Sequence, residues 1–158
     1  MNSTPLESSN RRVLVSAIAS LAASLIVGCA TQGGGEPVPL SVHPPVSLNV
    51  VPANSPCPPT WTCWTTGGWT VQISEEPINT DKDSSPVEIH WIVIANGWTF
   101  DQNKGIDFRN NAVWKPKRVT DKEWKASNRK DGLIYKYAIN LVSPTGVALP
   151  PWDPTVMN

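Results

Sequence analysis

The sequence predicts an all-β fold, a single small antiparallel β-sandwich, for residues 46–158. The first observation is composition: residues 29–158 contain 13 Val and 8 Ile but only 5 Leu, and branched side chains favour strands over helices. The second is pattern, because short alternating segments are separated by turn residues, as in sandwiches and barrels. The length of 158 residues suits one domain.

Six segments have the alternation or branched composition of strands, and turn residues such as Asn96-Gly97 and Asp131-Gly132 lie between them. They are 47–50, 69–74, 87–95, 106–108, 135–141 and 146–149. One further segment, 121–130, is predicted to be a short helix. Thr120 and Glu123 match a capping box, and no Gly or Pro follows before Gly132.

The first 28 residues predict a signal peptide. Arg11 and Arg12 precede an uncharged apolar run of 15 residues, 13–27. About 20 apolar residues are needed to span a bilayer as a helix, so the run is short for a permanent anchor. A membrane-anchoring or buried helix is the alternative. The arginine pair leaves twin-arginine export open beside general secretion.

The end of this run, Ile26-Val27-Gly28-Cys29, resembles the lipobox of bacterial lipoproteins. The resemblance implies a diacylglycerol on the Cys29 sulfur and cleavage before that residue. Ala30 implies sorting to the outer membrane, facing the periplasm. Several buried acyl chains, at about 0.8 kcal/mol per methylene, attach a protein firmly to a membrane. Residues 29–45, rich in Gly and Pro, are predicted to be a tether.

The two remaining cysteines, Cys57 and Cys63, are predicted to form a disulfide, since an exported domain meets an oxidising compartment. The alternative is a metal site completed by His43 or His90, although five intervening residues do not match zinc-finger spacing.

The chain's final segments, 135–141 and 149–156, resemble the close of small uncharacterised bacterial β-sandwich proteins of immunoglobulin-like or cupredoxin-like shape. This resemblance implies a fold and no activity. A blue-copper site needs a free cysteine and two histidines in one place, and the sequence offers no such set. No metal or other cofactor is predicted.

Catalytic candidates are few. Glu88 and His90 share one face of a predicted strand, where they form either an acid/base pair or a solvated polar face. The solvated face is favoured, and no catalytic residue is assigned. Alternate acidic and polar residues from Asn79 to Ser85 allow a loose calcium site, against which a polar turn is favoured.

The basic residues and the tryptophans provide the candidate binding residues. Thirteen basic and 13 acidic residues exclude a bulk nucleic-acid binder. The predicted function is a lipid-anchored cell-envelope protein with a non-catalytic binding or structural module, meeting an envelope protein or glycan. An accessory enzyme or factor acting on envelope glycans is the alternative. The candidate contact residues are Trp61, Trp64, Trp98, Trp114, Lys115, Lys117, Arg118 and Trp124.

Overall fold

The computed structural model describes residues 39–109, 113–128 and 130–158. All regular secondary structure in these residues is β-strand, and they contain no helix that could cross a membrane. The strands are β1 (Ser41–Val42), β2 (Val46–Pro52), β3 (Thr62–Thr66), β4 (Trp69–Ile73), β5 (Ile78–Asn79), β6 (Val87–Val93), β7 (Thr99–Phe100), β8 (Ile106–Phe108), β9 (Lys117–Thr120), β10 (Glu123–Asn128), β11 (Ile134–Ile139), β12 (Leu141–Val142) and β13 (Thr155–Met157). The predicted signal peptide and lipobox lie outside the described residues.

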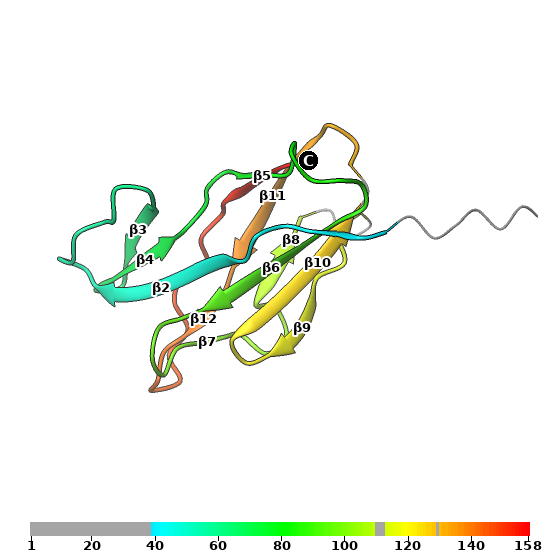
Figure 1. Ribbon diagram of the computed structural model, residues 1–158. Coiled ribbons are helices and arrows are strands. Elements are labelled where there is room, and N and C mark those ends of the chain that lie inside the picture. The colour runs from blue at the N-terminus through cyan, green and yellow to red at the C-terminus, as the bar shows by residue number, and fades with distance from the viewer. Residues whose placement is uncertain (1–38, 110–112, 129) are drawn as a thin grey trace, which may run out of the picture. The chain divides into compact units, whose positions relative to one another are not determined.

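The larger sheet has seven strands, and β1 pairs with β6 beside the main path. The main path runs in the order β3-β4-β2-β6-β10-β9 (Figure 1). Both β1 and β2 run parallel to β6, and β13 runs parallel to β5. The wholly antiparallel sandwich predicted from the sequence was therefore wrong, because the sheets are mixed. Pro44 and Pro45 separate β1 from β2, as prolines cannot donate ladder hydrogen bonds. Strand pairing begins at Ser41, five residues before the predicted domain boundary.

A second layer covers one face of the larger sheet and gives a β-sandwich-like arrangement. It consists of a four-stranded sheet, β5-β13-β11-β8, and the β12-β7 pair. The layers meet through aromatic rings: Trp91 of β6 lies 6.0 Å from Phe108 of β8 and 5.4 Å from Tyr137 of β11, between ring centroids. Strand β6 alternates as predicted, with Val87, Ile89, Trp91 and Val93 buried and Glu88, His90 and Ile92 on the opposite face.

The predicted helix over 121–130 was wrong. Residues 123–128 form β10, which pairs antiparallel with β6 along its whole length. The Thr120 hydroxyl accepts a hydrogen bond from the amide of Lys122 at 3.2 Å, so it shapes the β9–β10 turn instead of capping a helix. Trp124 and Ala126 alternate with more exposed neighbours and enter the core. Burial of the Trp124 indole and the pairing of six residues with β6 stabilise the strand. Together they stabilise it by more than a helix cap would stabilise the helix, about 1 kcal/mol.

The loop over 53–61 folds across the outer face of β4 and is closed by the Cys57–Cys63 disulfide, which confirms the predicted pairing. Gln72 donates to the carbonyl of Pro56 at 3.0 Å, and Thr70 donates to that of Ala53 at 3.1 Å. These bonds satisfy two polar side chains that the loop buries, as buried polar groups require.

Candidate binding site

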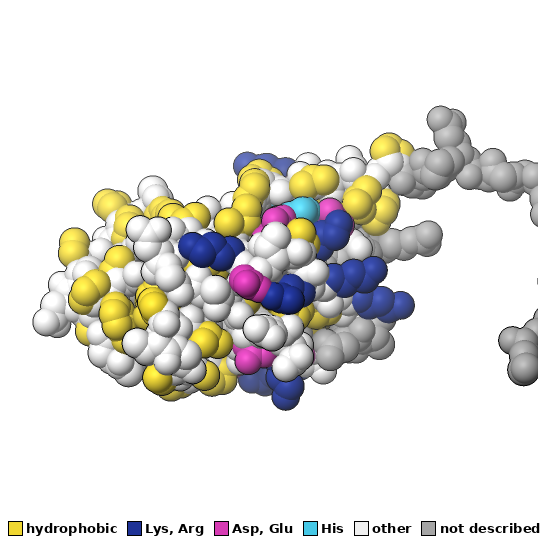
Figure 2. All heavy atoms as spheres, turned by 90° about the horizontal axis from the view of Figure 1, so that it is seen from below, with side chains coloured by type: hydrophobic (Ala, Val, Ile, Leu, Met, Phe, Trp, Pro, Cys, Tyr) yellow, Lys and Arg dark blue, Asp and Glu magenta, His cyan; other side chains and the backbone are white. Residues whose placement is uncertain are grey.

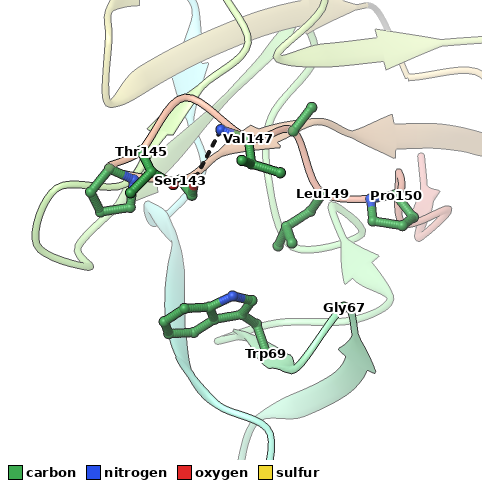
Figure 3. Close-up of a pocket in the computed structure, with 9 residues that line it drawn as sticks. Gly67, Trp69, Ser143, Thr145, Val147, Leu149 and Pro150 are labelled. Atoms are coloured by element: carbon green, nitrogen blue, oxygen red, sulfur yellow. Dashed lines mark hydrogen bonds between the residues drawn. The ribbon is translucent and has the colours of Figure 1, made fainter.

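An apolar hollow of about 410 Å³, here called the Trp69 groove, opens between the start of β4 and the segment that connects β12 to β13. The indole of Trp69 lies across it from Val147 and Leu149 (Figure 3). A hollow of this size lies in the range of small-ligand sites, roughly 300–1,000 Å³. Its lining is Gly67, Trp69, Ser143, Pro144, Thr145, Val147, Ala148, Leu149 and Pro150.

Local sequence explains how both walls of the groove form. On one side Gly67 and Gly68 have positive φ, 54° and 80°, which a two-residue hairpin between β3 and β4 requires. On the other side the amide of Val147 donates to the Ser143 hydroxyl at 3.0 Å, the bond dashed in Figure 3. This turn holds Val147 at the rim with 61% of its surface exposed. An exposed apolar side chain that a hydrogen-bonded turn holds in place is suited to contact a ligand.

Trp98 was predicted to be a contact residue, but the structure buries it to 3% exposure. Its ring meets that of Trp69 edge to face, with centroids 5.1 Å apart. Trp98 therefore supports the groove as part of the core. The sequence missed Trp69 as a site residue, because its place on an apolar stripe indicated only a core position.

A stacked pair of tryptophans adjoins the groove. Trp64 of β3 and Trp152, shortly before β13, lie with centroids 6.2 Å apart and planes 15° apart. Leu149 and Pro150 line both the groove and the narrow seam that holds this pair. Trp64, a predicted contact residue, thus lies beside the site. Trp61 is partly exposed in the disulfide loop and does not line the groove.

In the predicted basic contact stretch, the charged side chains are exposed and the two tryptophan rings are buried. Lys115, Lys117 and Arg118 are exposed, whereas Trp114 and Trp124 are buried at 0% and 5% exposure. Trp114 is enclosed in the core, whereas Trp124 also lines a hollow at this basic region. Figure 2 shows that hydrophobic side chains gather towards one end of the face in view and Lys and Arg towards the other.

A shallow polar hollow of about 390 Å³ lies at this basic region. Lys104, Lys115 and Arg118 line it together with Asp107. Arg118 already forms an ion pair with Asp121. The hollow is separate from the Trp69 groove, since the two share no lining residue.

Glu88 and His90 do lie together, in a cluster on the outer face of the larger sheet. The imidazole of His90 contacts Glu88 at 2.8 Å and Glu123 of β10 at 2.7 Å. Burial opposes the charge on His90, but the hydrogen bonds to Glu123 and Glu88 outweigh it and raise its pKa. Burial likewise opposes the charge on Glu88, whose pKa is nevertheless lowered by His90 and by Lys125, 3.1 Å away. His90 lines none of the hollows described here.

His43, assigned to the tether by the sequence, is buried at 5% exposure between two acids. Its ring nitrogens lie 2.6 Å from Asp83 and 3.0 Å from Glu75. Lys130 donates to the carbonyls of Asp81 and Asp83 and so occupies oxygens of the loop considered for calcium. No group of three or more His, Cys, Asp or Glu in the described ranges is arranged to hold a metal ion.

No family model matches this chain, and no curated protein matches it.

Proposed function

We propose that this chain is a lipid-anchored cell-envelope protein whose folded domain is a non-catalytic binding module. The observation that carries the binding role is the Trp69 groove, an open apolar hollow with a large aromatic wall and locally braced rims. The export leader and the lipobox ending at Cys29 support the anchor. A disulfide across an exposed loop fits the oxidising periplasmic side of an outer membrane. The domain is of the immunoglobulin-like or cupredoxin-like kind of sandwich.

The anchor is tested by metabolic labelling with a radioactive fatty acid. The native chain is expected to incorporate label and to fractionate with membranes, and Cys29→Ala is expected to abolish the labelling. Label that persists in Cys29→Ala would contradict the lipobox assignment.

The groove is tested by co-sedimentation of the solubilised full chain with bacterial envelope fragments that have been stripped of lipid. Val147→Asp places a charge at the apolar rim without disturbing the core, because this side chain is 61% exposed. The variant is expected to reduce retention at least tenfold. Leu133→Asp is the matched control, since Leu133 is 57% exposed and outside the groove. Equal retention of both variants would refute the groove as the binding site.

The alternative, an enzyme or accessory factor acting on envelope glycans, draws on the contacts of His90 with Glu88 and Glu123. A glycosidase requires two carboxyl groups flanking a bound substrate. The His90 cluster lies on an open sheet face, and Lys125 pairs with one of its carboxylates. A salt-bridged face supports the sheet better than it supports catalysis. His90→Ala is expected to leave envelope retention unchanged, whereas loss of a hydrolytic activity with retained folding would favour the enzyme.

A further inference from the structure

The polar hollow of about 390 Å³, here called the basic hollow, lies between edge strands of the two layers. Strand β8 ends the order of the four-stranded sheet, and β9 ends that of the larger sheet (Figure 1). Asp107 of β8 and Arg118 of β9 both line the hollow, so its walls come from both layers. The lining also includes Asn103, Lys104, Lys115 and Trp124.

The segment that carries Lys104 is held close to β10. The Asp101 carboxylate accepts hydrogen bonds from the amides of Asn103 and Lys104, both at 2.9 Å. Gly105 permits the close approach to β10, because a Cβ at this residue would lie 2.3 Å from the indole nitrogen of Trp124. The backbone on which Lys104 stands is therefore fixed before any ligand binds.

The segment that carries Lys115 is fixed by its two neighbours in sequence. Trp114 is fully buried and stacks on Phe108 of β8, with ring centroids 5.1 Å apart and planes 7° apart. Pro116 restricts the backbone on the other side of Lys115. Arg118 follows on β9, whose pairing with β10 holds it in place. Three basic side chains on ordered backbone thus meet at one hollow.

The protein neutralises the charges of the hollow only in part. Arg118 forms an ion pair with Asp121. The ammonium groups of Lys104 and Lys115 form no ion pair with the described residues. Among the same residues the carboxylate of Asp107 has neither a hydrogen bond nor an ion pair. The hollow therefore offers a ligand two unpaired cations and one unpaired hydrogen-bond acceptor.

We propose that the basic hollow binds a phosphate ester that also carries a hydroxyl group. The phosphate oxygens accept charge-assisted hydrogen bonds from Lys104 and Lys115, and the hydroxyl donates to Asp107. A neutral ligand fits poorly, because it leaves both ammonium groups without a counter-charge. An anion without a donor group meets the carboxylate of Asp107 with nothing to offset the repulsion.

The basic hollow is a second site, independent of the proposed role of the Trp69 groove. The two hollows have no lining residue in common. A failure of either proposal therefore leaves the other standing.

The test is isothermal titration calorimetry of the full chain with glycerol 3-phosphate, in a non-ionic detergent at low salt. We expect millimolar or tighter binding, and its absence would overturn the proposal. Lys115→Ala is expected to weaken the affinity about fivefold, since it removes one charge-assisted contact. Lys117→Ala is the matched control, because Lys117 is an exposed base that lies two residues away and outside the hollow. Equal weakening by both variants would indicate diffuse surface attraction and overturn the site.

Asp107→Asn tests the hydroxyl contact against inorganic phosphate, which lacks the glycerol group. Removal of the negative charge is expected to tighten the binding of inorganic phosphate. The ratio of the affinity for glycerol 3-phosphate to that for inorganic phosphate is expected to fall about fivefold, since an amide accepts the hydroxyl less strongly than a carboxylate. An unchanged ratio would overturn the role of Asp107. Malate binding tighter than glycerol 3-phosphate binding would overturn the phosphate class.

Phosphate esters of this kind occur as soluble molecules and as lipid headgroups, and a competition experiment distinguishes the two. Phosphatidylglycerol, which carries both a phosphate and hydroxyls, is added to the detergent micelles, with phosphatidylcholine as the control. Displacement of glycerol 3-phosphate by phosphatidylglycerol alone would support a lipid headgroup as the ligand. Retained binding in both lipids would support a soluble ester. Equal displacement by phosphatidylcholine, which has no hydroxyl, would overturn the proposed contact with Asp107.

Discussion

Glu76 provides a test of how this fold responds to pH. Oε1 of the Glu76 carboxylate accepts a hydrogen bond from the amide of Thr155 at 2.9 Å. The other oxygen, Oε2, is buried and has no hydrogen-bond partner among the described residues. Burial raises the pKa of Glu76 from 4.5 to about 7, against the opposing effects of Thr155 and Lys136. The folded protein therefore holds a proton at this site between about pH 4.5 and 7 that the unfolded chain releases.

The direction follows from linkage. Where the folded state binds more protons than the unfolded state, the free energy of unfolding falls as pH rises. The contribution of Glu76 is thus fully present below pH 4.5 and is lost as pH approaches 7. At about 1.4 kcal/mol per pKa unit the whole rise corresponds to roughly 3 kcal/mol. Because Glu76 is only partly buried, solvent screening reduces the expected loss to about 1–2 kcal/mol.

The assay is urea unfolding of the native chain and of Glu76→Gln, followed by tryptophan fluorescence from pH 4.5 to 8. The amide of Gln keeps an acceptor for Thr155 but cannot ionise. We therefore expect the native-minus-variant difference in unfolding free energy to fall by about 1–2 kcal/mol across this range. Asp81→Asn, an exposed acid, is the control and should give a parallel curve. Parallel curves for Glu76→Gln as well would refute the reasoning.

Three further perturbations have expected outcomes. Gly105→Ala should lower the unfolding free energy by about 1–3 kcal/mol in urea titrations, because its Cβ would lie 2.3 Å from the Trp124 indole nitrogen; an unchanged midpoint would contradict the packing described. Replacing Cys57 and Cys63 by Ser should cost about 2 kcal/mol, measured the same way, and a stability unaffected by reductant would count against this contribution. His90→Gln should destabilise the fold more at pH 5.5 than at pH 8, since a raised histidine pKa stabilises at low pH and the effect is lost as pH rises through the folded value; the opposite order in thermal melts would be inconsistent with the acidic contacts.

The sequence could predict much of the fold and little of the site. Segments with strong two-residue alternation, such as β6 and β11, were found from the sequence because burial of one sheet face imposes that period. Strand β10 was missed because the capping pattern of Thr120 and Glu123 overlaps the alternation over 123–128. Pairing with the neighbouring strand β6 favours the strand, and the sequence does not show that pairing. The Trp69 groove was missed because its walls come from residues 67–69 and 143–150, which are far apart in the sequence. No local pattern predicts that these two segments lie close together.

By itself the sequence determined the β class, the disulfide partners and, as a prediction, the lipid anchor, because each depends on composition or on residues close together in the chain. The tertiary structure alone decided which tryptophans are buried and which line a hollow. Trp98 and Trp114 fill the core, whereas Trp69 lines the groove. Burial depends on what packs from the opposite sheet, and that is set only when the two layers meet.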